Sequence, residues 1–182
     1  GVTMKSPRGV YLRDERRAMA LDSVHLSDGN VILTAKFGEY FVDPKRAFFR
    51  HQVVVQDSAS TVTADSLTYF RVDKRSIAQG NVTVYNRTDN ITITGHRLDH
   101  WSEKQFSRVT EEPVLTRIDS NNTGKFDTLV VRSRVMEAYR DTLKLLLAID
   151  SVRIIRTDLS AVCRLAKFYT QSDSIILRGS PI

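Results

Sequence analysis

One phrase of this sequence returns at a fixed interval. Val24, Val53 and Val82 each open a copy, since 53 − 24 and 82 − 53 both equal 29. The same interval separates further residues: Asp28 and Asp57, Ala35 and Ala64, Lys45 and Lys74, and Tyr11, Tyr40 and Tyr69. A unit of about 30 residues cannot bury its apolar face alone, so such units must stack on one another. The repeat therefore predicts an elongated structure with two free ends.

Weaker copies continue toward the C-terminus. Residues 162–182 match residues 62–82 at an interval of 100, which aligns Tyr169 with Tyr69. Residues 133–151 follow at an interval of 70, and His100 stands near the tyrosine position of the copy that opens at Val82. No change of composition and no linker interrupts the series. We therefore expect a single domain over residues 1–182.

Apolar residues alternate with other residues within the copies, which is the period of a half-buried strand. Turn signals such as Asp43-Pro44-Lys45 and Gly80-Asn81 separate these runs, and no window sustains helical spacing. The chain is therefore expected to be all-β. The alternating pairs are Val53 and Val55, Ile91 and Ile93, Leu129 and Val131, Leu145 and Leu147, and Val152 and Ile154.

Charge excludes some classes of partner. The net charge is +6, and the basic residues are scattered in pairs such as Arg16-Arg17 and Lys74-Arg75, with no dense block. A nucleic-acid-binding protein concentrates its cations on one face, so we expect no nucleic-acid partner. The charge is compatible with a small anionic ligand such as a phosphorylated lipid. No apolar run reaches the roughly 20 residues of a membrane helix.

Three motifs resemble the repeat of OstA-like proteins: Ala64-Asp65-x-Leu67-x-Tyr69, the Asp73-Lys74 turn, and Ala78-x-Gly80-Asn81-Val82-x-Val84. That family includes the lipopolysaccharide-transport proteins LptA and LptC and the N-terminal domain of LptD. Gly95-x-x-Leu98 resembles the segment that follows in the family, with His100 in place of a tyrosine. The resemblance covers residues 24–113 well and residues 130–182 loosely.

The resemblance implies an antiparallel β-taco, an open β-jellyroll-like fold of two opposed sheets that holds acyl chains between them. It also implies a role in carrying lipopolysaccharide or its lipid A part across the periplasm of a Gram-negative bacterium to the outer membrane. The implied partners are other OstA-like domains, joined by strand-edge pairing, and a head-to-tail homo-oligomer. Because Ile182 falls where another unit would begin, we expect the segment to belong to a longer chain with an exposed C-terminal edge.

Alternation selects ten candidate interior residues that would line a lipid-binding cleft: Val53, Val55, Val62, Leu67, Val82, Val84, Ile91, Ile93, Leu145 and Leu147. Burial of hydrocarbon is worth about 0.8 kcal/mol per methylene group, so such a lining could shelter acyl chains. The alternative is that these residues fill a dry core. Likewise, Tyr11, Tyr40 and Tyr69 are expected in one row, where stacked rings stabilise the sheet or touch a ligand.

We expect that the chain is not an enzyme, and that it has no cofactor, no metal site and no catalytic residue. His96 and His100 have a zinc-binding spacing on a helix, but on a strand they would lie about 13 Å apart. Cys163, aligned with Thr63, is expected to be a buried structural thiol. Two other functions stay open: a ligand-free β-solenoid scaffold or adhesin, and a carbohydrate-active β-helix enzyme with parallel strands.

Overall fold

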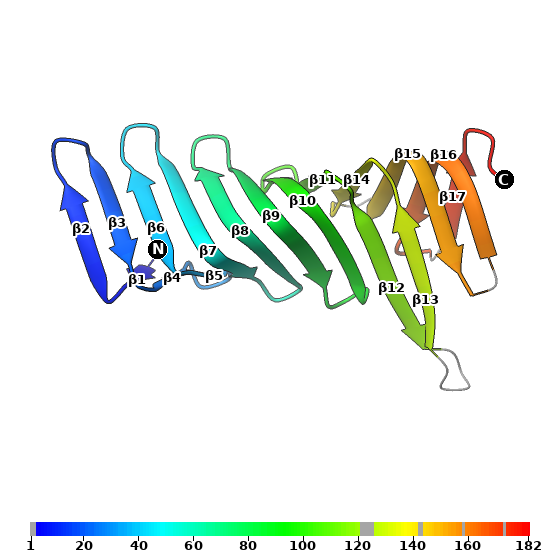
Figure 1. Cartoon of the computed structure of the whole chain (residues 1–182), viewed down its shortest axis with the longest axis horizontal. Coiled ribbons are helices and arrows are strands. Elements are labelled where there is room, and N and C mark those ends of the chain that lie inside the picture. The colour runs from blue at the N-terminus through cyan, green and yellow to red at the C-terminus, as the bar shows by residue number, and fades with distance from the viewer. Residues whose placement is uncertain (1–2, 121–125, 142–143, 158, 173) are drawn as a thin grey trace.

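The computed structural model describes residues 3–120, 126–141, 144–157, 159–172 and 174–182, and it is all-β over these residues. Among them there is no helix that could span a membrane. The described residues form one sheet system of 17 strands (Figure 1). The strands are β1 (Thr3–Lys5), β2 (Arg8–Leu12), β3 (Arg17–Leu21), β4 (Val24–Ser27), β5 (Ile32–Ala35), β6 (Phe37–Phe41), β7 (Arg46–Gln56), β8 (Ser60–Phe70), β9 (Arg75–Asn86), β10 (Ile91–Trp101), β11 (Phe106–Thr110), β12 (Val114–Ser120), β13 (Phe126–Arg132), β14 (Val135–Tyr139), β15 (Leu145–Arg156), β16 (Leu159–Tyr169) and β17 (Ser174–Arg178).

Every pairing between these strands is antiparallel. The parallel β-helix expected for a carbohydrate-active enzyme is therefore not the architecture of this chain. The 29-residue repeat corresponds to two successive antiparallel strands, each bent once or interrupted near its middle. Stacking of these strand pairs produces the elongated shape in Figure 1.

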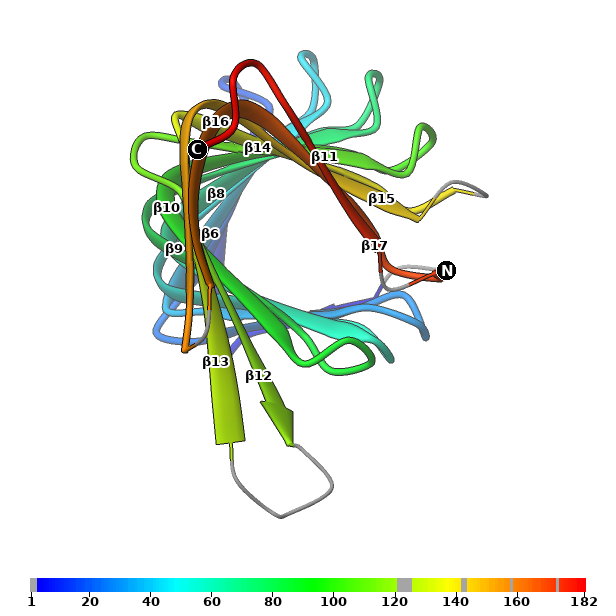
Figure 2. The same ribbon diagram turned by 90° about the vertical axis from the view of Figure 1, so that its right-hand side faces the viewer.

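The bends divide the sheet into two walls. In β7, residues Arg46–Arg50 pair with β6, whereas residues Val54–Gln56 pair with β5. The upper wall follows the pairing order β2, β3, β6, β7, β8, β9, β10, β11, β14, β15, β16 and β17. The lower wall follows the order β1, β4, β5, β7, β8, β9, β10, β12, β13, β15 and β16. Figure 2 shows the strands curving around a central space, with turns of both walls toward its open side.

Pairs of residues with positive φ produce the bends. His51 and Gln52 have φ angles of 64° and 55°, and Glu111 and Glu112 have angles of 62° and 63°. Register shifts occur at the same level in β7, β8, β10 and β15. A bulge of this kind bends a strand and increases its twist. The bulges therefore fold each long strand out of one wall and into the other.

Hydrogen bonds between successive turns tie the upper rim together. These turns end at Arg16, Lys45, Lys74, Gln105 and Lys144, whose φ angles lie between 41° and 48°. The carbonyl of each of these residues accepts a bond from the main-chain N–H that opens the next turn, at 2.9–3.1 Å. The donors are Val42, Arg71, Ser102, Arg140 and Thr170. The recurrent charged turns noted in the sequence thus form a continuous rim (Figure 1).

Asp28, Asp57 and Asn86 shape successive turns of the lower rim. The Asp57 carboxylate accepts hydrogen bonds from the N–H groups of Ala59 and Ser60 at 2.8 and 2.6 Å. Asp28 accepts two equivalent bonds, and the amide oxygen of Asn86 does the same. Short polar side chains favour such turns because they satisfy main-chain N–H groups locally.

The predicted row of tyrosines is confirmed, but the predicted stacking of their rings is wrong. Tyr40 pairs with Ala18 and Ala47, and Tyr69 pairs with Ala47 and Ser76. Tyr11 opens the row beside Ala18, and His100 continues it beyond Ser76. Because a small residue stands between successive tyrosines, the rings lie two strands apart, or roughly 10 Å. Large and small side chains therefore alternate along this row.

The alignment of the C-terminal copy is wrong by one residue. Val53 pairs with Ala64 just before the register shift of β7 and β8, and Val152 pairs with Cys163 at the matching place in β15 and β16. Cys163 therefore corresponds to Ala64 and not to Thr63, and Phe168 corresponds to Tyr69. Phe168 is buried in the core, whereas Tyr169 alternates with it.

Candidate functional site

A hollow of about 280 Å³ lies between the two walls near the middle of the chain. Its apolar lining comes from the lower wall at Val84, Ile91 and Ile93 and from the upper wall at Leu98, Val109, Met136 and Leu146. All of these except Val84 are buried, and Val84 is half-buried against the core. Alternation places them on the inner face, because residues two apart on a strand share a face.

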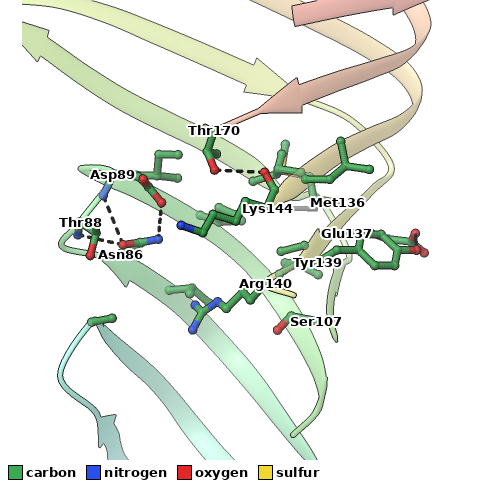
Figure 3. A pocket seen from close by; sticks show the side chains of 18 of the residues that line it. Asn86, Thr88, Asp89, Ser107, Met136, Glu137, Tyr139, Arg140, Lys144 and Thr170 are labelled. Atoms are coloured by element: carbon green, nitrogen blue, oxygen red, sulfur yellow. Dashed lines mark hydrogen bonds between the residues drawn. The ribbon is translucent and has the colours of Figure 1, made fainter. Parts of the chain in front are cut away.

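Polar and cationic side chains surround the opening of this hollow. Arg140 and Lys144 come from the turn between β14 and β15, and both are exposed. In Figure 3 their side chains reach into the space that faces the turn of Asn86, Thr88 and Asp89. The opening therefore offers two cations beside an apolar interior.

Arg140 reaches from the upper rim to the lower rim. Its Nη1 donates to Ser60 Oγ at 3.5 Å, although 80 positions separate the two residues in sequence. Ser60 Oγ in turn donates to the Asp57 carboxylate at 2.9 Å. The guanidinium thus lies between the rims. Its planar set of N–H donors suits an anion with several oxygens, such as a phosphate.

The charge of Arg140 acts on two groups nearby. Burial lowers the pKa of His100, and the positive charge of Arg140 lowers it further, so both effects favour the neutral imidazole. The His100 ring lies 2.9 Å from Ser107 Oγ. Burial raises the pKa of Asp57, but bonds from the N–H groups of Ser60 and Ala59 and from the Ser60 hydroxyl outweigh it, and Arg140 adds to the net lowering.

Eight of the ten candidate interior residues lie in the core or pack against it. Val53, Leu67, Val82, Ile91 and Ile93 are buried, and Val55, Val62 and Val84 pack against this core. Of these eight, Val84, Ile91 and Ile93 line the hollow. The other five fill the walls nearer the N-terminus.

Leu145 and Leu147 lie on the opposite face of β15 from the one expected. Leu146 and Ala148 are the buried residues of this segment, and Leu147 pairs with Glu137 and Lys167. The run Leu145-Leu146-Leu147-Ala148 is apolar at every position, so alternation alone does not identify its inner face. Shifting the assignment by one residue reverses the direction of every side chain. Leu145 still borders the hollow at its rim.

Sequence reasoning did not select several residues of the site. Leu98 stands in a quoted motif, and Val109 continues the alternation, so a full count of each strand could have found both. Met136 and Leu146 required the correct register of β14 and β15. No pattern in the sequence predicts the contact between Arg140 and Ser60, because that contact depends on how the two walls face one another.

The histidines and the cysteine considered for a metal site or a reactive thiol have the following places. Those residues contain no group of three or more His, Cys, Asp and Glu side chains that could hold a metal ion. Cys163 is buried. His96 lies exposed at the bend of β10, whereas His100 is part of the inner tyrosine row. The fold and the hollow together define an all-β trough with an apolar interior and a cationic opening.

Comparison with known proteins gives a limited result. No family model and no curated protein matches the chain. Among solved structures, the chain is similar to LptH from Pseudomonas aeruginosa, described as the LptA-homologous periplasmic component of a conserved lipopolysaccharide transport device. The TM-score is 0.38 at 9% sequence identity, over 99% of this chain and 83% of LptH.

Proposed function

We propose that this chain binds the acyl chains of lipopolysaccharide, through its lipid A part, between the two walls, and that it helps carry them across the periplasm to the outer membrane. The observation that carries the proposal is the apolar hollow that opens beside Arg140 and Lys144. An acylated and phosphorylated lipid has hydrocarbon for the interior and anionic groups for the opening. The motifs that resemble OstA-like repeats support the same ligand.

The energetics favour such a ligand. Each methylene group that leaves water contributes about 0.8 kcal/mol, so ~10 methylene groups would contribute about 8 kcal/mol before the costs of association. A phosphate group at the opening would form charge-assisted hydrogen bonds with Arg140, and Lys144 would add a second charge. The trough does not need to close over the ligand, because its open side leaves room for a bulky headgroup.

The cationic opening gives the first test. Arg140→Ser combined with Lys144→Ser is expected to weaken binding of lipid A by about 10- to 100-fold, since each of the two lost contacts is worth about 0.7–1.4 kcal/mol at this exposed opening. Displacement of a fluorescent lipid A analogue measures this. Arg13→Ser combined with Arg71→Ser removes the same charge from exposed turns of the upper rim and should leave binding unchanged.

The expected loss depends on the phosphate groups. With dephosphorylated lipid A, the Arg140→Ser/Lys144→Ser variant and the unmodified chain should bind equally. If the variant loses affinity for both lipids alike, the two cations do not recognise phosphate and this part of the proposal fails. If the unmodified chain binds neither lipid, the function as a whole is wrong.

The two ends of the trough suit assembly. β1 and β2 form one end and β17 the other, and each has a strand with a single pairing partner in the described structure. Such edges bind other strands by main-chain hydrogen bonds. We therefore include edge-to-edge pairing with other OstA-like domains, or head to tail between copies, in the proposed function.

Self-association should depend on concentration and on the exposed N–H groups of β17. Light scattering should show oligomers that grow with protein concentration. Ile176→Pro should remove them, because proline lacks the donor and disfavours pairing. A chain that remains monomeric up to millimolar concentration would contradict pairing between copies.

A ligand-free scaffold or adhesin is the second candidate. A dry core would leave the walls packed throughout, whereas the hollow beside Val84 and Ile93 has a volume of about 280 Å³. Native cores contain few voids larger than a water molecule. This volume favours a ligand over a scaffold with a filled core.

A further inference from the structure

The residue types on the outer face of the lower wall change toward the C-terminus. On β8, β9 and β10 this face carries threonines, among them Thr63, Thr83 and Thr94, which pair with one another across the strands. On β12, β13, β15 and β16 it carries large apolar residues and arginines as well, beside Thr116 and Thr128. We call these residues the C-terminal outer patch: Ile118, Phe126, Arg132, Arg153, Ile155 and Val162.

Alternation and pairing place the patch on one face. Leu129, Val131, Val152 and Ile154 are buried, so the residues between them point outward. Ile155 pairs with Val130, which stands two residues from Arg132 on β13. Phe126 is 77% exposed, and Ile155 and Val162 are each half exposed or more, which is unusual for so many large apolar side chains on one face.

Arg132 and Arg153 stand directly opposite one another. They are register partners in β13 and β15, both are exposed, and Arg153 also pairs with Val162. Like charges at opposed positions destabilise a sheet. Among the described residues, no carboxylate forms an ion pair with either arginine, whereas Arg134 nearby lies 3.4 Å from Asp150. The arrangement therefore favours an anionic partner outside this chain.

The hairpin of β12 and β13 carries part of the patch away from the body of the molecule. It extends past the other turns of the lower rim, as Figures 1 and 2 show. Phe126 begins β13 at the outer end of this hairpin, and Ile118 lies on β12 across from Thr128. An apolar group in front of two arginines matches a bilayer surface, where phosphate groups overlie hydrocarbon.

We propose that the C-terminal outer patch docks on a lipid bilayer whose surface carries anionic phosphate headgroups. Phe126 and Ile118 enter the boundary between headgroups and acyl chains, and Arg132 and Arg153 bind headgroup phosphates. This docking is separate from the inner hollow and does not depend on the proposed lipid cargo.

Sedimentation with vesicles tests the docking. The chain should bind vesicles of phosphatidylcholine mixed with phosphatidylglycerol and should not bind vesicles of phosphatidylcholine alone. Arg132→Ser combined with Arg153→Ser should weaken binding about 30-fold, because each arginine near an anionic surface contributes about a factor of five or six. Phe126→Ser should weaken it about tenfold.

Two controls separate docking from general effects. Arg13→Ser combined with Arg71→Ser gives the same net charge and should leave vesicle binding unchanged. The Arg132→Ser/Arg153→Ser variant should unfold at the same temperature as the unmodified chain or a higher one, since it removes a repulsion.

Three results would overturn the proposal. The first is equal binding to neutral and anionic vesicles, or binding to neither. The second is full binding by the Arg132→Ser/Arg153→Ser variant. The third is full binding by Phe126→Ser, because a purely ionic surface would suit a soluble acidic polymer and not a membrane.

Discussion

Val84→Asp is expected to remove the binding of lipid A acyl chains while the chain stays folded. Val84 lines the hollow, and it pairs with Val62 on one side and Ile93 on the other. It is only half-buried, so the empty trough can hydrate an aspartate there. A bound acyl chain would instead exclude water from the carboxylate, at a cost of several kcal/mol. We therefore expect at least about a 100-fold loss of affinity.

The neighbouring residue provides a matched control. Thr83 lies on the same strand but on the outer face, between Thr63 and Thr94. Thr83→Asp introduces the same charge one residue away and should bind the fluorescent lipid A analogue as the unmodified chain does. Equal affinity of Val84→Asp and Thr83→Asp would contradict an interior site for the acyl chains.

Asp99→Ala is expected to destabilise the chain by about 2–3 kcal/mol. Asp99 is buried on β10 and accepts hydrogen bonds from Arg75 and from Arg97, the latter at 2.7 Å from Nε. Its loss leaves two arginines beside one another without their carboxylate. Removing one partner of a fully buried pair costs about 3–5 kcal/mol, and the two arginine side chains are each about a third exposed, which reduces the effect.

The same group gives a dependence on pH. Burial raises the pKa of Asp99, but hydrogen bonds from Arg97 and Arg75 outweigh it and hold the pKa below its ordinary value. The unfolded chain therefore binds this proton more readily, and the stabilisation is present above the ordinary pKa and is lost as the pH falls through the folded value. Urea unfolding at several pH values measures both effects.

Asp14→Ala is the control for Asp99→Ala. Asp14 is exposed at the first turn of the upper rim, and its loss should change the free energy of unfolding little. If Asp99→Ala unfolds at the same urea concentration as Asp14→Ala, the buried carboxylate does not stabilise the sheet.

The interval of 29 residues was sufficient to predict an elongated stack of strand pairs, because matched residues of successive pairs recur at that interval, whereas the two opposed walls were implied by the resemblance to OstA-like repeats. Asp28, Asp57 and Asn86 occupy the equivalent position in successive turns of the lower rim. Tyr11, Tyr40 and Tyr69 occupy one row of the upper wall. A strand period of two then identifies the inner face wherever apolar and polar residues alternate. This explains why the candidates between Val53 and Ile93 are correctly placed on the interior.

The same reasoning fails where both faces of a strand are apolar. In β15, Leu145 and Leu147 satisfy the pattern as well as Leu146 and Ala148 do, and only the pairing with Met136 and Ala138 identifies the second pair as inner. The inner positions keep one phase along β15 but shift by one residue in its partner β16, where Ala161 and Cys163 are buried before the register shift and Ala166 and Phe168 after it. Alignment by residue type cannot detect such a change, since a bulge adds a residue without a recognisable signature.

The cationic opening lay beyond sequence reasoning for a different reason. Arg140 and Lys144 belong to a rim turn, where charged residues are common and carry no information by themselves. Their importance comes from the contact of Arg140 with Ser60 across the trough and from the hollow beneath them. Both follow from the distance between the two walls, which is set by packing and not by any local pattern.

Transfer of magnetisation between lipid and protein tests most directly whether acyl chains bind between the two walls. Lipid A with labelled acyl chains, bound to the chain with labelled methyl groups, should give intermolecular nuclear Overhauser effects to Ile91, Ile93, Leu98 and Leu146, which line the hollow. The methyl groups of Val72, which is 71% exposed, should give none. Effects confined to exposed methyl groups such as those of Val72, with none to the residues of the hollow, would contradict an apolar trough that accepts hydrocarbon.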